Sequence, residues 1–307
     1  MTHNMIHFTI IALCAIGFDS HRTASGFSGV DGRVALIPCA VQDGAPPQSM
    51  PSLTIEYVDQ PASSSRRRAR RRRMPGYKVA PVKNGGTLVG TVLFNGQSPD
   101  ARKIDIVKDH EVCGKRKTKV SLIQSDEKGR VAEAVVYLAD IKQGRGFIRP
   151  RKKPPVINQH QCTFVPHVQA VRIKEDVEIL NSDTVAHNIN ATQRIYTLFN
   201  ILQPQKEMRA TKQFKKPGLI SLRCNVHAWM QGWLWVFRHP YYQVTGSDGA
   251  FRLEDIPVGK YELAVWQEHL GVQYFSVDVK AGETVTVPVE LMEKQNGGKR
   301  QNVKTSK

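Results

Sequence analysis

Short strand-like segments recur along this 307-residue chain, and helical periodicity of useful length is hard to find anywhere in it. Val285–Leu291 alternates apolar and polar residues, while Ala134–Leu138 and Tyr261–Trp266 are rich in β-branched and aromatic residues. Both patterns are typical of strands. Turn-forming residues are frequent, with 23 Gly and 17 Pro. The sequence therefore predicts an all-β protein, and its length predicts two domains rather than one.

The formal net charge of +17 is concentrated in part at the two ends of the chain. Seven arginines between positions 66 and 73 account for seven of these charges, and +17 minus 7 leaves +10. A Lys/Arg-rich tail over residues 293–307 carries a further part of the positive charge. Runs of this kind are usually solvated arms. Because zinc-finger spacing, an RNP-like motif and a basic amphipathic helix are all missing from the sequence, nucleic acid is not the expected partner.

The first 80 residues read as a leader followed by a low-complexity, Arg-rich linker. The apolar run Met5–Phe18 is too short to span a membrane as a helix and better matches the apolar core of a signal peptide. We expect no transmembrane span, and a periplasmic or secreted location.

Two distant segments supply soft metal ligands. Cys224, His227 and Met230 lie within seven residues of each other, and His187 lies about forty residues upstream. One thiolate, two imidazoles and one thioether are the ligand set of a blue-copper electron-transfer site. A strand-like run ends at Arg223, directly before the cysteine, and Trp233–Phe237 resumes strand character after it. The alternative is that these are ordinary core and loop residues, since free Cys is often buried.

This Cys-x-x-His-x-x-Met loop, with the upstream His187-Asn188, resembles the cupredoxins of plastocyanin and amicyanin type. The resemblance covers residues 131–238 and implies a Greek-key β-sandwich that holds one type 1 copper. It makes His187, Cys224 and His227 the equatorial ligands and Met230 the axial one. Asn188 then ties the two ligand loops together from outside the ligand shell. Two departures, Arg223 before the thiolate and Trp229 within the loop, remove no ligand.

Three of the five cysteines, Cys39, Cys113 and Cys162, are left once Cys224 is assigned to copper and Cys14 to the leader. Cys113 and Cys162 both flank the predicted sandwich. They form either a disulfide, which suits an oxidising compartment, or two free buried thiols. A second metal site at His160, Cys162 and His167 is a further alternative.

A second unit is predicted over residues 241–292. Asp248-Gly249 between apolar strands indicates a hairpin, and Pro257-x-Gly259-x-Tyr261 closes the next turn. This stretch resembles the carboxypeptidase regulatory-like, or transthyretin-like, β-sandwich. Residues 81–130 hold N-terminal strands that complete it in one interpretation, which makes the copper domain an insertion. The arrangement is similar to secreted bacterial proteins labelled as methylamine-utilisation proteins, although no residue here indicates methylamine.

The resemblance implies single-electron transfer outside the cytoplasm. The alternatives are a copper storage or delivery protein and a structural cell-surface protein. We expect no enzyme, because the chain lacks the additional His cluster of multicopper oxidases. His227 is expected to be the solvent-exposed ligand through which electrons pass. The expected redox partner is an acidic cytochrome, docked on an apolar patch at Ala228 and Trp229.

Overall fold

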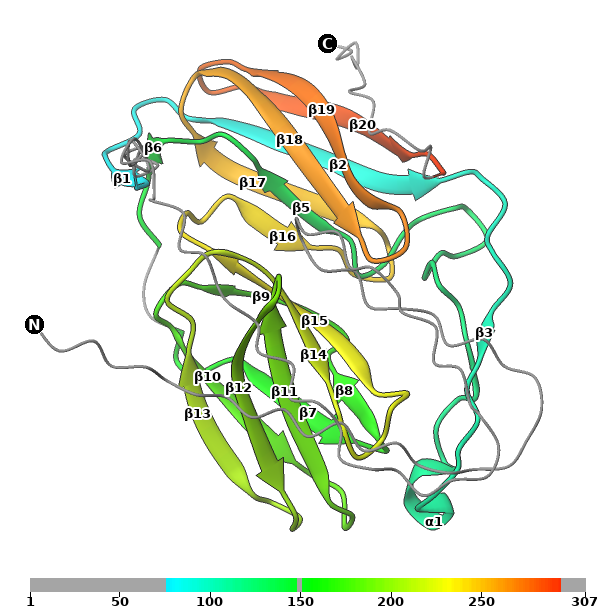
Figure 1. Cartoon of the computed structure of the whole chain (residues 1–307). Coiled ribbons are helices and arrows are strands. Elements are labelled where there is room, and N and C mark those ends of the chain that lie inside the picture. Colours follow the sequence, from blue (N-terminus) through cyan, green and yellow to red (C-terminus); the bar gives the residue numbers. More distant parts are fainter. Residues whose placement is uncertain (1–75, 148–150, 294–307) are drawn as a thin grey trace, which may run out of the picture. The chain divides into compact units, whose positions relative to one another are not determined.

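Two β-sandwiches hold most of the regular structure in this computed structural model, which describes residues 76–147 and 151–293 (Figure 1). The described residues all fall in one compact unit. Most of the predicted leader and linker (residues 1–75) and the basic tail from residue 294 lie outside them. Among the described residues, no helix has the length and apolar character needed to cross a membrane.

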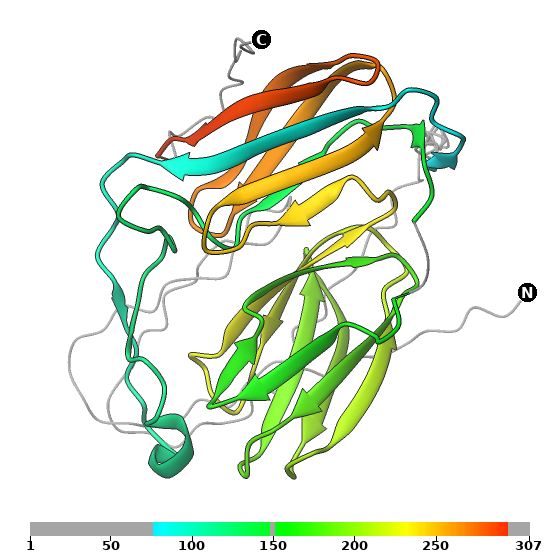
Figure 2. The ribbon, with the colours of Figure 1, turned by 180° about the vertical axis from the view of Figure 1, so that it is seen from behind.

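The first sandwich packs a four-stranded sheet, in the order β13-β10-β7-β8, against a five-stranded sheet, in the order β12-β11-β14-β15-β9. Figures 1 and 2 show its two layers from opposite sides. Alternate residues face the core, as Val177 and Ile179 do on β10. The strands are β7 (Val156–His160), β8 (Thr163–Val165), β9 (Val168–Arg172), β10 (Asp176–Asn181), β11 (His187–Gln193), β12 (Tyr196–Gln203), β13 (Arg209–Gln213), β14 (Gly218–Arg223) and β15 (Gln231–Phe237).

The second sandwich packs a sheet in the order β16-β5-β18-β19 against one in the order β17-β2-β20. Four and three strands give seven in all. The alternation predicted for Val285–Leu291 is present, because Val287, Val289 and Leu291 are buried in this core. The strands are β2 (Gly86–Phe94), β5 (Val135–Leu138), β16 (Tyr242–Val244), β17 (Ala250–Ile256), β18 (Gly259–Gln267), β19 (Gly271–Val279) and β20 (Thr284–Leu291).

The predicted domain boundary at residue 131 is wrong. Strand β5 pairs with β16 and β18, so it belongs to the second sandwich rather than to the copper domain. Strand β2 pairs with β17 and β20 and also completes the second sandwich. The first sandwich, β7 to β15, is therefore inserted into the chain of the second.

The predicted hairpin at Asp248-Gly249 is only partly right. The turn forms, with Gly249 in the left-handed region at φ 64°, but its two flanking strands enter different sheets. β16 pairs with β5, whereas β17 pairs with β2. The turn crosses from one layer of the sandwich to the other.

Aromatic residues join the two sandwiches. Val168, Ala170, Trp235 and Phe237 from β9 and β15 form one buried cluster with Val135 and Trp266 from β5 and β18. The ring centroids of Trp235 and Trp266 lie 5.9 Å apart, edge to face. The β9 and β15 half of the five-stranded sheet is thus covered on its outer face.

The remaining elements are small. β1 (Lys78–Val79) pairs with β6 (Gln143–Gly144), and β3 (Arg102–Lys103) pairs with β4 (Lys119–Val120). Between β3 and β4 runs a loop that we call the strap, residues 104–118, which contains the single turn of helix α1 (His110–Cys113). The β3–β4 pair closes the base of the strap.

Candidate metal centre

The loop between β10 and β11 is shaped by a buried amide. The Asn181 side chain accepts a hydrogen bond from the Asp183 N–H at 2.9 Å and donates to the Val185 carbonyl at 3.0 Å. Such Asx turns are favoured where a chain must reverse at the end of a strand. The turn positions Asp183 and delivers His187 as the first residue of β11, with no exposed surface.

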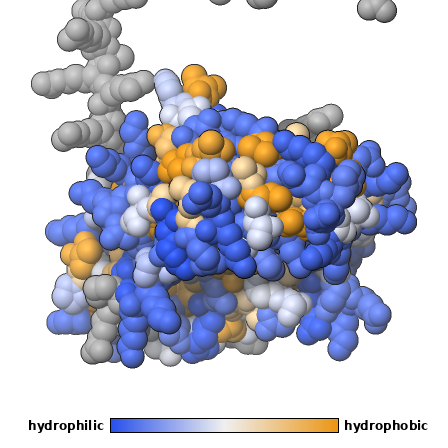
Figure 3. Space-filling model, turned by 90° about the horizontal axis from the view of Figure 1, so that it is seen from below, coloured by the Kyte–Doolittle hydropathy of each residue, from blue (hydrophilic) through white to orange (hydrophobic). Residues whose placement is uncertain are grey.

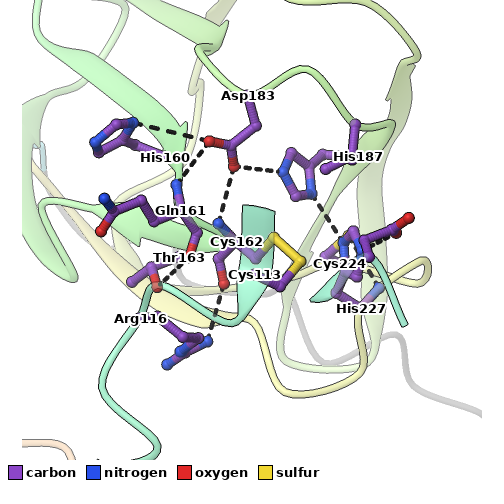
Figure 4. Close-up of a disulfide and its surroundings, with 12 residues drawn as sticks. Cys113, Arg116, His160, Gln161, Cys162, Thr163, Asp183, His187, Cys224 and His227 are labelled. Carbon is purple, nitrogen blue, oxygen red and sulfur yellow. Dashed lines mark hydrogen bonds and ion pairs between the residues drawn. A yellow bond between two sulfur atoms is a disulfide. The ribbon is translucent and has the colours of Figure 1, made fainter. Parts of the chain in front are cut away.

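Asp183 connects His187, one of the candidate ligands, to the turn between β7 and β8 (Figure 4). Its carboxylate accepts hydrogen bonds from Nε2–H of His187 at 2.8 Å and from the backbone N–H groups of Gln161 and Cys162 at 2.7 and 2.8 Å. Both turn residues have positive φ, which is uncommon outside glycine and is compensated here by these bonds. Burial alone raises the pKa of Asp183, but the hydrogen bonds hold it below its ordinary value.

The cysteine loop closes on itself between β14 and β15. The Cys224 N–H donates to the Met230 carbonyl at 3.3 Å, and the Met230 N–H donates to the His227 carbonyl at 2.9 Å. The His227 N–H points back at Cys224 Sγ, 3.4 Å away. Cys224, His227 and Met230 are all buried, and Met230 shares the hydrophobic cluster of Cys224.

Asn188 connects the two loops by hydrogen bonds. Its Oδ1 accepts hydrogen bonds from the N–H groups of Asn225 at 2.5 Å and Val226 at 3.2 Å. Its own backbone N–H lies 3.5 Å from Cys224 Sγ and donates to it. The sulfur therefore accepts two backbone N–H groups, which is the kind of outer contact that tunes a metal thiolate.

The three predicted equatorial ligands converge. The ligand atoms of His187, Cys224 and His227 all lie within 4.8 Å of one another. The two Nδ1 atoms are 2.9 Å apart, and Cys224 Sγ lies 3.9 Å from Nδ1 of His227. Each Nε2 is hydrogen-bonded to a carboxylate, that of Asp183 for His187 and that of Asp109 for His227, both at 2.8 Å.

This donor set fits a metal ion. When each Nε2–H donates to a carboxylate, each neutral ring presents the Nδ1 lone pair. Two facing lone pairs cannot hydrogen-bond to each other, whereas one cation bonded to both nitrogens at about 2.0–2.1 Å spans their separation. Burial raises the pKa of the Cys224 thiol, but the contacts of its sulfur with His187, His227 and the backbone N–H groups of Asn188 and His227 more than offset burial and lower the pKa to about 6. The thiol is thus readily converted to the thiolate that a soft metal requires.

His227 is not the solvent-exposed ligand that the sequence led us to expect. Its side chain has no exposed surface, because the strap covers it. Asp109 on the strap accepts the His227 Nε2–H, and the disulfide between Cys113 and Cys162 fastens α1 to the β7–β8 turn (Figure 4). Arg116 adds a hydrogen bond from Nη1 to the Cys162 carbonyl at 2.9 Å.

The alternative second site at His160, Cys162 and His167 does not form in this structure. Cys162 is in the disulfide, and His160 lies at the surface with Nδ1 3.8 Å from Asp183. His167 instead contacts Glu268 at 2.6 Å and the Gln231 carbonyl at 3.0 Å.

The two residues that depart from the cupredoxin pattern lie beside the site. Arg223 is exposed at the end of β14. Trp229 is half-buried, with its ring centroid 5.0 Å from that of His227.

Two site residues were missed by sequence reasoning. Asp183 lies four residues before His187, and that spacing was an available signal. Asp109 lies 118 residues from its partner His227, and no local pattern connects them.

Solved copper proteins resemble part of this chain at low identity. A mutant of amicyanin in its reduced Cu(I) form at pH 4 is 19% identical, with a TM-score of 0.25, over 27% of this chain and 82% of its own. Another reduced amicyanin mutant is 15% identical, with a TM-score of 0.26, over 33% and 98%. The Cu-containing nitrite reductase (NirK) from Thermus scotoductus SA-01 is 19% identical, with a TM-score of 0.26, over 32% and 26%. Likeness at this level carries no conclusion about function.

A family profile described as polysaccharide lyase family 4, domain II, matches residues 213–287. That stretch runs from the last residue of β13 into β20 and so includes strands of both sandwiches. It covers less than half of the chain and does not assign the chain to that family. A search of curated proteins finds no match.

Proposed function

We propose that this protein is a type 1 copper protein that transfers single electrons outside the cytoplasm. The observation that carries the proposal is the convergence of one buried thiol and two Nδ1 lone pairs, with each ring anchored by a carboxylate. Bound copper would supply a one-electron couple at this point. His187, Cys224 and His227 would hold it, and we propose the soft thioether of Met230 as a fourth ligand.

The chain's own contribution is rigidity. Asp183 and Asp109 fix the two rings, while Asn188 fixes the cysteine loop against β11. Ligands that are held in place reorganise little when the charge at the site changes by one, which favours fast transfer. We assign the site electron transfer and no catalytic role.

Two further features enter the proposal. The disulfide between Cys113 and Cys162 supports a periplasmic or secreted location, because disulfides persist in oxidising compartments. The seven strands of the second sandwich support its assignment as a carboxypeptidase regulatory-like module.

The decisive experiment is addition of Cu(II) to the purified full chain. We expect an intense blue colour that bleaches on reduction. Cys224→Ser should abolish the colour, since the absorption arises from charge transfer between the thiolate and copper. Met230→Leu should keep the colour and raise the reduction potential, since only the weak thioether ligand would be lost.

His167 provides a matched control, because it is a partly buried histidine with two hydrogen-bond partners outside the site. His187→Ala should lose copper stoichiometry and colour, whereas His167→Ala should keep both. The opposite pair of results, or an unchanged spectrum in Cys224→Ser, would refute the ligand assignment.

A further inference from the structure

The strap prevents a protein partner from reaching the outer edge of His227. The imidazole has no exposed surface, and its outer nitrogen is bonded to Asp109. Ile106 and Val112 of the strap pack on the core of the first sandwich. A partner that exchanges electrons with this site therefore needs another face of the molecule, at which a ligand lies close to the surface.

The cysteine side offers such a face. Arg223 and Asn225, the two neighbours of Cys224, are both exposed. Cys224 Sγ accepts the N–H of Asn188, and Asn188 lies directly opposite Leu202 in the register of β11 and β12. Leu202 is 59% exposed. One hydrogen bond and one strand pairing thus connect the thiol to the surface of β12.

Strand β12 is an uncharged, apolar strand at the edge of the five-stranded sheet. Tyr196, Leu198 and Leu202 are exposed on it. Leu202 lies opposite Asn188, and Leu198 lies at the bulge where the pairing with β11 shifts by one residue. Natural edge strands are usually protected by charge or proline. The second sandwich covers the β9 and β15 half of this sheet, and nothing in the described residues covers this apolar row. Figure 3 shows apolar side chains gathered among hydrophilic ones on the face viewed from below.

The charge around this face indicates which kind of partner can bind to it. In the sheet that contains β12, the strands β11, β12 and β14, the turn between β11 and β12 and the cysteine loop carry two cations, Arg194 and Arg223, and no acidic residue. A second copy of the chain would bring the same positive charge to the same face, and like charges across an interface are costly. An acidic partner is attracted instead.

We propose that an acidic redox protein docks on the exposed side of β12, with Leu198 and Leu202 at the centre of contact, and exchanges electrons through the Cys224 side. Electron-transfer complexes bury little surface, so a patch formed by a few side chains of one strand suffices. This inference rests on the proposed function and replaces Ala228 and Trp229 as the docking surface.

The test compares matched exposed residues in the full chain, with an acidic c-type cytochrome as the probe. Leu198→Ala/Leu202→Ala removes the centre of the patch. Val107→Ala on the strap and Val258→Ala in the second sandwich remove exposed side chains elsewhere, which are 74% and 57% exposed. Arg194→Glu reverses a charge beside the patch, with Lys260→Glu as its control.

Two quantities are measured for each variant: the Kd of the copper-free protein for the oxidised cytochrome, and the bimolecular rate of electron transfer after copper loading. The double variant and Arg194→Glu should each weaken binding and slow transfer about tenfold, since two central truncations or one reversed charge cost on the order of 1 kcal/mol. The three control variants, Val107→Ala, Val258→Ala and Lys260→Glu, should match wild type, and the blue spectrum should be unchanged throughout.

Binding weakened by Val107→Ala and not by the double variant would place docking on the strap and overturn the proposal. Self-association of the wild type through β12 would also overturn the proposal, as would the absence of any binding to the cytochrome. A protein that binds the cytochrome through β12 but shows no blue colour with Cu(II) would refute the proposed function and leave the docking surface standing.

Discussion

Asn188 is the residue on which the geometry of the two ligand loops depends most directly. Its Oδ1 satisfies the N–H groups of Asn225 and Val226, and its Nδ2 donates to Asn200 Oδ1 at 2.5 Å. It is buried, with 4% of its surface exposed. Truncation would leave two backbone donors of the cysteine loop without their acceptor.

We expect Asn188→Ala to lower the free energy of unfolding of the copper-free protein by about 2 kcal/mol, because unsatisfied buried donors cost roughly 1–3 kcal/mol. Urea unfolding measures this. Asn190→Ala is the control, since its side chain makes a longer and exposed contact of 3.5 Å to Asn225. It should stay within about 0.5 kcal/mol of wild type. Equal losses for the two variants would contradict the role of Asn188.

Local sequence patterns predicted the identity of the candidate ligands but not their exposure to solvent. His187, Cys224 and His227 follow from residue chemistry combined with strand-like flanks, and the structure brings their ligand atoms together. The burial of His227 could not be predicted in this way. It depends on Asp109, which is distant in sequence and sits in a strap with no periodic pattern. Exposure of a ligand is a property of tertiary structure rather than of its own loop.

At the scale of elements, the strap is held mainly by cross-links. Its helix α1 has four residues, far too few to be stable alone. The disulfide between Cys113 and Cys162 spans 49 residues, the Asp109 carboxylate binds His227, and two apolar side chains pack on the core. Removal of the disulfide should therefore release the strap first.

We expect the double variant Cys113→Ser/Cys162→Ser to lose about 4 kcal/mol of stability by the loop-closure relation for this separation. Hydrogen exchange should speed up throughout residues 104–118, and His227 of the copper-free protein should become reactive toward diethyl pyrocarbonate. Asp109→Ala, which keeps the disulfide, should expose His227 with a much smaller loss of stability. Unchanged exchange in the double variant would show that packing alone holds the strap.

Alternation along a strand predicts which residues face a core but not which core they face. β5 shows this limit. Val136 and Leu138 are buried in the second sandwich, while Val135 belongs to the cluster between the two sandwiches. A strand that is buried on both faces has the same apolar sequence pattern whichever sandwich it belongs to. The predicted boundary at residue 131 was wrong for this reason. Pairing with β16 and β18 is a long-range choice that the local sequence does not encode.

At the scale of the whole molecule, the two sandwiches share an aromatic layer and one partly buried ion pair. The Glu268 carboxylate, beyond the end of β18, accepts hydrogen bonds from His167 Nε2–H at 2.6 Å and from the Trp233 Nε1–H at 2.5 Å. His167 Nδ1–H donates to the Gln231 carbonyl. With both ring nitrogens donating, His167 is the imidazolium. Burial lowers its pKa, but Glu268 more than offsets this and raises the pKa above 6.5.

This pair makes the junction dependent on pH in a definite direction. A raised histidine pKa stabilises the folded state below its ordinary value of 6.5, and the gain is lost as pH rises through the folded value. The pKa of Glu268 is raised by burial but lowered overall by His167 and Trp233, so its gain is present above 4.5 and lost as pH falls. The pair therefore contributes most between about pH 4.5 and 6.5.

We expect His167→Gln to lower the free energy of unfolding by about 1–2 kcal/mol at pH 5.5, and by less at pH 8.5, because the gain from the raised histidine pKa declines once the pH exceeds the ordinary value of 6.5. The magnitude is discounted because the two side chains are 28% and 20% exposed. Urea unfolding at both pH values measures it, with the exposed His269→Gln as the control that should show no such difference. A cost for His167→Gln that grows from pH 5.5 to 8.5 would mean that the neutral ring, rather than the ion pair, holds the two sandwiches together.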